Sequence, residues 1–150
     1  MKLFGAKEKL KILFVSSEEA PFAKVGGLGE AMFSLPRMLA HLGHDARVMI
    51  PCYGTIDFGI YGAPYAYKGL NVPTTSEKGG KTLVCNVKKY EPPKLDKNPV
   101  TTYFLENREY YELRANLYGY KDDHVRFALL SKGCLEWLLL MEDLIAKKDK

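Results

Sequence analysis

The stretch that most constrains the fold is residues 12–42, where a short apolar segment, a glycine-rich loop and an apolar repeat follow one another. Residues 12–15 are apolar with no alternating polar positions, which is typical of a strand buried on both faces of a sheet. Glycines occupy positions 26, 27 and 29, and Gly43 ends the stretch. Between them, apolar residues recur every three or four positions, which predicts an amphipathic helix: Leu28, Met32, Leu35, Leu39 and Leu42.

The glycine-rich loop before this helix, residues 24–30, is a candidate anion site. A helix start carries unpaired N–H groups and a partial positive charge, and Lys24 adds a full charge nearby. The glycines would equally serve to turn the chain and to pack helix on strand, and their spacing leaves both interpretations open. The usual nucleotide signatures fit poorly, because the chain has no Gly-Lys-Ser/Thr and lacks the third glycine of a dinucleotide-binding loop.

The rest of the chain predicts an α/β fold with a Rossmann-like open, mainly parallel sheet and flanking helices. Residues 45–50 indicate a second strand parallel to the first, and Pro51 closes it at the carboxyl edge, where ligands of such sheets collect. Residues 100–105 have the composition of another strand, while residues 65–67 and 81–90 predict a small hairpin or meander beside the main sheet. A last helix begins at Asp122 or Asp123 and presents one apolar side: Phe127, Leu130, Cys134, Trp137, Met141 and Ile145.

Composition limits the class of protein. A length of 150 residues with 47% hydrophobic content suits one globular domain, residues 1–150. The net charge of +4 is concentrated in the lysine-rich first eleven residues, so a nucleic-acid partner is not expected. Three widely separated cysteines without a metal-binding pattern predict reduced, buried thiols in a cytoplasmic protein. No metal and no cofactor are expected. No export signal and no membrane partner are expected.

Two blocks of the sequence resemble the glycogen and starch synthase family. Residues 17–30, SEEAPFAKVGGLGE, resemble its opening signature, in which Lys-x-Gly-Gly-Leu follows a Ser-Glu-x-x-Pro run. The likeness continues through Leu-Gly-His at 42–44 and VMIPCYG at 48–54. Residues 118–127, YGYKDDHVRF, resemble the family's Tyr-Gly followed by Asp-Asn-x-x-Arg-Phe, with Asp123 in place of the usual asparagine.

This resemblance implies a retaining glycosyltransferase of the GT-B fold that transfers glucose from ADP-glucose or UDP-glucose to an α-1,4-glucan, without a metal. It implies that Lys24, Gly26 and Gly27 lie beside the donor phosphates and glucose. Glu30, where many relatives have aspartate, is implied to lie near the acceptor. Further substrate-binding candidates come from the two matching blocks: Glu18, Tyr118, Asp122 and Asp123.

The family's His-x-His-Asp-Trp motif and its second, nucleotide-binding domain have no counterpart in these 150 residues. We therefore expect an amino-terminal portion of a synthase, with no catalytic residue of its own and no turnover in isolation. Its partners would be the nucleotide sugar, the glucan and a missing carboxyl-terminal domain or separate chain. Two alternatives stay open, namely a non-catalytic or split-enzyme module with a weak phosphate or glucan site, and an unrelated nucleotide-binding α/β protein.

Two smaller predictions concern the segment before the last helix. Four tyrosines, at positions 110, 111, 118 and 120, suit either plain packing or contact with a sugar ring. Arg126 is expected to anchor Asp122 or a loop carbonyl group.

Overall fold

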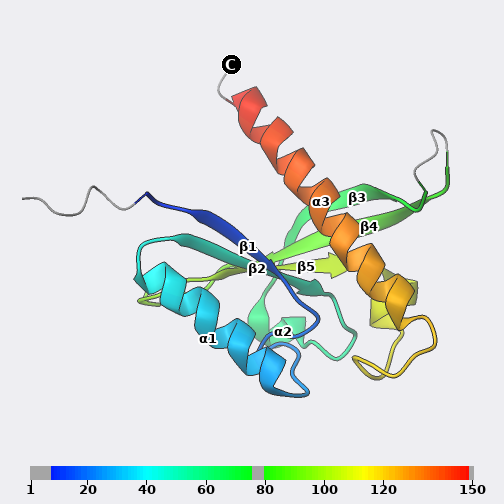
Figure 1. The fold of residues 1–150 in the computed structure, drawn as a ribbon, viewed down its shortest axis with the longest axis horizontal. Helices are drawn as coiled ribbons and strands as arrows, with labels where there is room; N and C mark the ends of the chain where they lie inside the picture. Colours follow the sequence, from blue (N-terminus) through cyan, green and yellow to red (C-terminus); the bar gives the residue numbers. More distant parts are fainter. Residues whose placement is uncertain (1–7, 76–79, 149–150) are drawn as a thin grey trace, which may run out of the picture.

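The computed structural model describes residues 8–75 and 80–148 of the chain. Its centre is a five-stranded sheet in the order β1-β2-β5-β4-β3 (Figure 1). Three strands are parallel, which confirms the predicted fold class: β1 (Lys11–Val15), β2 (Asp45–Pro51) and β5 (Thr101–Glu106). The lysine-rich start up to residue 7 and the last two residues lie outside the described part.

The predicted hairpin is part of this sheet and does not lie beside it. It consists of β3 (Tyr65–Pro73) and β4 (Thr82–Tyr90), and β4 pairs antiparallel with β5. Alternate residues of the hairpin, such as Val72 and Val87, are fully buried on the same face as Leu105 of β5. Burying this apolar row gains more when it continues the core of the main sheet than when the hairpin packs separately.

Helices cover both faces of the sheet. The helices α1 (Gly27–His41) and α2 (Phe58–Tyr61) lie on one face, and α3 (Asp123–Lys148) crosses the other (Figure 1). A single wide helical turn, η1 (Arg108–Glu112), follows β5. The core on the α1 face contains Phe22, Val48, Ile50 and Phe104. The core on the α3 face contains Met49, Leu105, Leu130, Cys134 and Trp137.

The first strand and helix are less buried than the sequence predicts. The strand β1 lies at an open edge of the sheet, so none of its residues is fully buried. The prediction that the leucine face of α1 packs inward is also wrong, because Leu28, Leu35 and Leu42 are exposed. Gly29 and Pro36 are the buried positions instead. A Cβ on Gly29 would lie 2.9 Å from Lys24 Cγ, so the absence of a side chain there lets the helix approach its own loop.

The long helix α3 is closer to expectation. Leu130, Cys134 and Trp137 are buried as predicted, whereas Ile145 near the helix end is exposed. Gly133 lies against β5, since a Cβ there would approach Leu105 Cδ2 to 2.6 Å. All three cysteines are buried and unpaired. Among the described helices, none combines the length and the hydrophobicity that crossing a membrane requires.

Candidate functional site at the carboxyl ends of the parallel strands

The loop between β1 and α1 lies where the parallel strands end, and it is tied down by its own backbone. Ser16 N–H donates to the carbonyl of Met49 in β2. Glu19 and Ala23 exchange two backbone hydrogen bonds of 2.9 Å, and Ala20 N–H donates to Gly29 O in the first turn of α1. The loop therefore has a defined shape before any ligand arrives.

Glu18 is the central residue of this loop. Its side chain is buried, with the residue only 4% exposed, yet it makes three hydrogen bonds. Oε2 accepts the N–H groups of Val25 at 2.8 Å and Gly26 at 3.0 Å. Oε1 accepts the hydroxyl of Tyr118 at 2.6 Å. Burial raises the pKa of the Glu18 carboxyl, but these hydrogen bonds outweigh burial and lower the pKa below its ordinary value.

Lys24 forms an ion pair with Glu30 at the mouth of the same loop. The two side chains are 45% and 56% exposed, so water screens the pair and it contributes little to stability. Gly26, the residue just before α1, is in extended conformation and has no side chain with which to cap the helix. The first N–H groups of α1, on Gly27 and Leu28, have no acceptor within the helix.

The structure brings Tyr118 to this loop from a hundred residues further along the chain. Its hydroxyl lies 2.7 Å from Ser17 Oγ as well as contacting Glu18. Tyr53, which follows β2, donates its hydroxyl to the carbonyl of Ser17 at 2.9 Å. The structure thus brings together six of the predicted site residues: Lys24, Gly26, Gly27, Glu30, Glu18 and Tyr118. Sequence reasoning missed Ser17 and Tyr53 as members of this network, although both lie in segments that match the family.

The two aspartates predicted as secondary site residues hold the segment before α3 together. Asp122 pairs with Arg114 at 2.6 Å. Asp123 Oδ2 accepts the backbone N–H of Gly119 at 2.8 Å and of Tyr120 at 3.2 Å. Its other oxygen pairs with Arg126 at 2.6 Å.

The buried side chain of Arg126 ties the start of α3 to the preceding segment. Its guanidinium donates to the carbonyls of Tyr110 and Leu117. The predicted carbonyl anchor is confirmed, but the acidic partner of Arg126 is Asp123 and not Asp122. Tyr111, fully buried with its hydroxyl on the Arg126 carbonyl, is a packing residue.

A second carboxyl group of the loop, Glu19, has no counterpart in the sequence predictions. It is 1% exposed, and Thr102 Oγ1 donates to its carboxyl group, with oxygen distances of 2.9 and 3.0 Å. Burial raises the pKa of Glu19 to about 8, so this carboxyl group is mainly protonated at neutral pH. An acidic pair in a loop normally indicates solvent exposure, and no sequence signal marks the second member as buried.

Another polar cluster lies at the end of β5. Glu106 accepts hydrogen bonds from Tyr65 at 3.0 Å and Asn86 at 2.5 Å, and it pairs with Lys88 at 3.0 Å. Burial raises the pKa of Glu106, but the hydrogen bonds from Asn86, Lys88 and Tyr65 outweigh it and lower the pKa. The cluster is internally satisfied, and its contacts account for the burial of Glu106.

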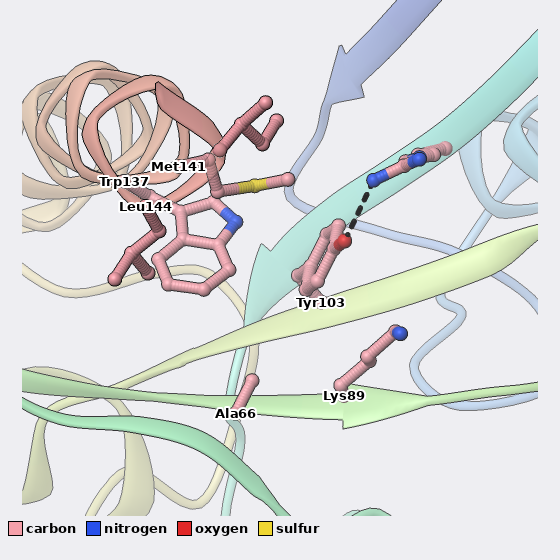
Figure 2. Close-up of a pocket in the computed structure, with 8 residues that line it drawn as sticks. Ala66, Lys89, Tyr103, Trp137, Met141 and Leu144 are labelled. Atoms are coloured by element: carbon pink, nitrogen blue, oxygen red, sulfur yellow. Dashed lines mark hydrogen bonds between the residues drawn. The ribbon is translucent and has the colours of Figure 1, made fainter. Parts of the chain in front are cut away.

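Two adjoining hollows of about 260 and 300 Å³ lie away from the glycine loop, between α3 and the sheet. They open near the starts of β1 and β2, the opposite end from the loop. Figure 2 shows Trp137 and Met141 of α3 facing Tyr103 of β5, whose hydroxyl accepts a 3.0 Å hydrogen bond from Arg47. The walls are mostly apolar, so we interpret these hollows as parts of the interface between α3 and the sheet that are not fully packed.

Comparison with known proteins finds matches to synthases of glycogen and starch. The family model for the starch synthase catalytic domain matches residues 11–149. The glycogen synthase of Clostridium acetobutylicum is 41% identical over 136 residues, covering 89% of this chain and 26% of that protein. That of Geotalea daltonii is 37% identical, covering 94% of this chain and 31% of that protein. The chain thus spans about a quarter to a third of the length of these relatives.

A solved structure has the same fold. The catalytic domain of starch synthase IV from Arabidopsis thaliana, bound to ADP and acarbose, superposes with a TM-score of 0.72 at 24% identity. The match covers 90% of this chain and 26% of that one. At this identity the likeness establishes the fold, and residue roles require separate arguments.

Proposed function

Because this chain belongs to the starch synthase catalytic-domain family, we propose that it supplies the phosphate-binding side of a glucosyltransferase acting on a nucleotide sugar. One observation carries the proposal: the family's lysine and glycines lie together at the carboxyl ends of the parallel strands, at the start of a 15-residue helix. In open α/β sheets this is the edge at which ligands bind.

The chemistry follows from charge. When glucose leaves the donor, negative charge develops on the departing diphosphate, and groups already oriented towards it lower the barrier. Lys24 offers a full positive charge, and the N–H groups at the start of α1 offer partial ones. Exchanging Glu30 for a phosphate at Lys24 costs little, because an exposed ion pair of this kind contributes about 0–1 kcal/mol.

The substrates are proposed from the family. We propose ADP-glucose or UDP-glucose as donor and an α-1,4-glucan as acceptor, with retention of the anomeric configuration. The ADP and acarbose bound to the starch synthase IV domain favour ADP-glucose and an oligosaccharide acceptor. Glu30 would then lie towards the acceptor, with Glu18, Tyr118, Asp122 and Asp123 shaping the site behind it. The three buried thiols fit a cytoplasmic protein.

Residues 1–150 would act as one domain that needs further polypeptide for turnover. The relatives are three to four times longer, and the His-x-His-Asp-Trp motif is absent from these residues. Exposed apolar residues of α1 and α3, such as Leu35 and Leu139, offer surface for that polypeptide. A split enzyme, whose second half is a separate chain, satisfies the same observations.

Ligand titration followed by NMR tests the proposal. ADP-glucose, UDP-glucose, NAD and a maltooligosaccharide are added in turn to the ¹⁵N-labelled chain. We expect the sugar nucleotides to shift the amide signals of Lys24, Gly27 and Leu28 at millimolar concentration, since the other half of the donor site is missing. Shifts of this loop with NAD and none with either sugar nucleotide would favour an unrelated nucleotide-binding protein.

A further inference from the structure

In the loop that the family resemblance assigns to the donor, two backbone N–H groups are already bound by a side chain of the same chain. The N–H groups of Val25 and Gly26 both donate to Glu18 Oε2, at 2.8 and 3.0 Å. Glu18 is 4% exposed and is held from its other oxygen by Tyr118 at 2.6 Å. A carboxylate with three donors, two of them backbone N–H groups, is a strong hydrogen-bonded unit.

A donor phosphate therefore meets a loop in which the Gly26 N–H is taken. To use that N–H, the phosphate would have to expel a buried carboxylate and break its hydrogen bond with the Tyr118 hydroxyl. The next two N–H groups, on Gly27 and Leu28, lie in the first helical turn and have no intrahelical acceptor. The approach to them is open, because a Cβ built on Gly26 or Gly27 would meet nothing within 4 Å.

We propose that Glu18 is a positioning residue that fixes the loop by capping Val25 and Gly26, so that Gly27, Leu28 and Lys24 meet the diphosphate. The inference rests on the proposed function and divides the roles of the two glycines, because the Gly26 N–H is bound by Glu18 and Gly27 contributes the hydrogen bond to the donor. Gly29 belongs to the same arrangement, since a Cβ there would lie 3.2 Å from Glu18 Oε2.

Glu18 is better suited to positioning the loop than to competing with the donor. A side-chain carboxylate that competes with the donor phosphate has to leave its partner easily. The exposed Glu30 can leave Lys24 in this way. Glu18 instead connects three segments, because it follows β1 in the chain, accepts the N–H groups of the loop before α1 and accepts from Tyr118 in the segment before α3. Removing it would leave two loop N–H groups unpaired and release the loop from its anchor.

Amide hydrogen exchange and ADP titration, both followed by NMR on this chain, test the inference. We compare the wild type with Glu18→Ala and Glu18→Gln, and use Glu91→Gln, an exposed glutamate paired with Lys89, as the matched control. Exchange at Val25 and Gly26 should accelerate at least about tenfold in Glu18→Ala. The acceleration should be smaller in Glu18→Gln, because the glutamine oxygen can take the position of Oε2 and accept both N–H groups without the full negative charge. The control should exchange like the wild type.

In the wild type, ADP should shift the amide signals of Gly27 and Leu28 and leave the slow exchange of Val25 and Gly26 in place. Glu18→Ala should bind ADP about tenfold more weakly, and added formate should restore part of that affinity by filling the vacated carboxylate position. Tyr118→Phe, which keeps the carboxylate, should retain slow exchange at both amides. It is the variant to measure if Glu18→Ala does not fold.

Tighter ADP binding by Glu18→Ala, or unchanged exchange at Val25 and Gly26, would overturn the inference. Loss of the slow exchange at these amides when ADP binds to the wild type would overturn it too. If the wild type binds no nucleoside diphosphate, the proposed function fails by itself. The exchange rates of the Glu18 variants then still decide whether Glu18 holds the loop.

Discussion

The carboxyl edge of the sheet and the outer surface of the helices differ in how well their side chains are satisfied by contacts within this chain. At the carboxyl edge, buried polar groups such as Glu18, Glu19 and Glu106 all have hydrogen-bond donors. On the outer surface, α1 exposes Leu35, α3 exposes Leu139 and the edge strand β1 is open on one side. The candidate site is thus largely preformed within this chain, whereas the exposed apolar surface of the helices fits the proposal that more polypeptide covers it.

The largest expected effect is at Gly54, where the loop after β2 touches η1. A Cβ at Gly54 would lie 2.1 Å from the backbone carbonyl oxygen of Glu112, and that oxygen cannot move without shifting η1. Gly54→Ala should therefore lower the free energy of unfolding by about 3 kcal/mol or more. Urea denaturation followed by circular dichroism measures it.

Gly27→Ala is the matched control, because a Cβ at Gly27 meets nothing within 4 Å. It should change stability by no more than about 1 kcal/mol, in the stabilising direction, since alanine favours a helix. Equal stability of Gly54→Ala and the wild type would mean that the carboxyl edge is less tightly built than the comparison requires.

Two leucines of α3 compare the inner and outer surfaces on one helix. Leu130 is 4% exposed against the sheet, while Leu139 is 59% exposed. Leu130→Ala should cost about 3 kcal/mol of unfolding free energy through the lost burial and the cavity left behind. Leu139→Ala should stay within about 0.5 kcal/mol and reduce any self-association seen by light scattering. A large cost at both positions would show that the outer surface is already covered in solution.

The buried Glu19 gives the carboxyl edge a pH dependence. Its pKa is about 8 in the folded chain and near 4.5 in the unfolded chain, because burial disfavours the charged form. Between these values the unfolded state binds fewer protons, so the contribution of Glu19 to stability falls as pH rises. Glu19→Gln should remove this loss and be more stable than the wild type at pH 8, by on the order of 2 kcal/mol.

Thermal unfolding at pH 5 and at pH 8 checks the Glu19 prediction. The two proteins should differ little at pH 5, where Glu19 is protonated in the folded state. A constant difference at both pH values would mean that Glu19 remains ionised inside the protein, stabilised by the positive charge of Arg37.

The sequence predicts the sheet better than it predicts the surroundings of the sheet. The strands, the βαβ unit and the inner face of α3 follow from local apolar patterns, because each pattern has one way to bury itself. The orientation of α1 does not, since its leucine face and its glycine-proline face both fit a helix and tertiary packing selects the second. The hairpin likewise shows its strands in the sequence but not the neighbour to which they pair.

Within the candidate site, the motif locates the loop but not its hydrogen bonds. The positions of Lys24, Gly27 and Glu30 at one place follow from strand, loop and helix in sequence order. The occupation of the Gly26 N–H by Glu18, and the approach of Tyr118, depend on contacts between distant segments, for which a single sequence carries no spacing signal. The burial of Glu19 against Thr102 is of the same kind.

Binding of ADP-glucose to Lys24→Ala is the most direct test of the claim that this loop receives the diphosphate of the donor. Lys94→Ala, at an exposed lysine in the connection before β5, is the control. NMR titration should show about tenfold weaker binding by Lys24→Ala, with unchanged unfolding and with wild-type affinity in the control. Equal affinity of the two variants, or unfolding of Lys24→Ala without a change in affinity, would contradict the account.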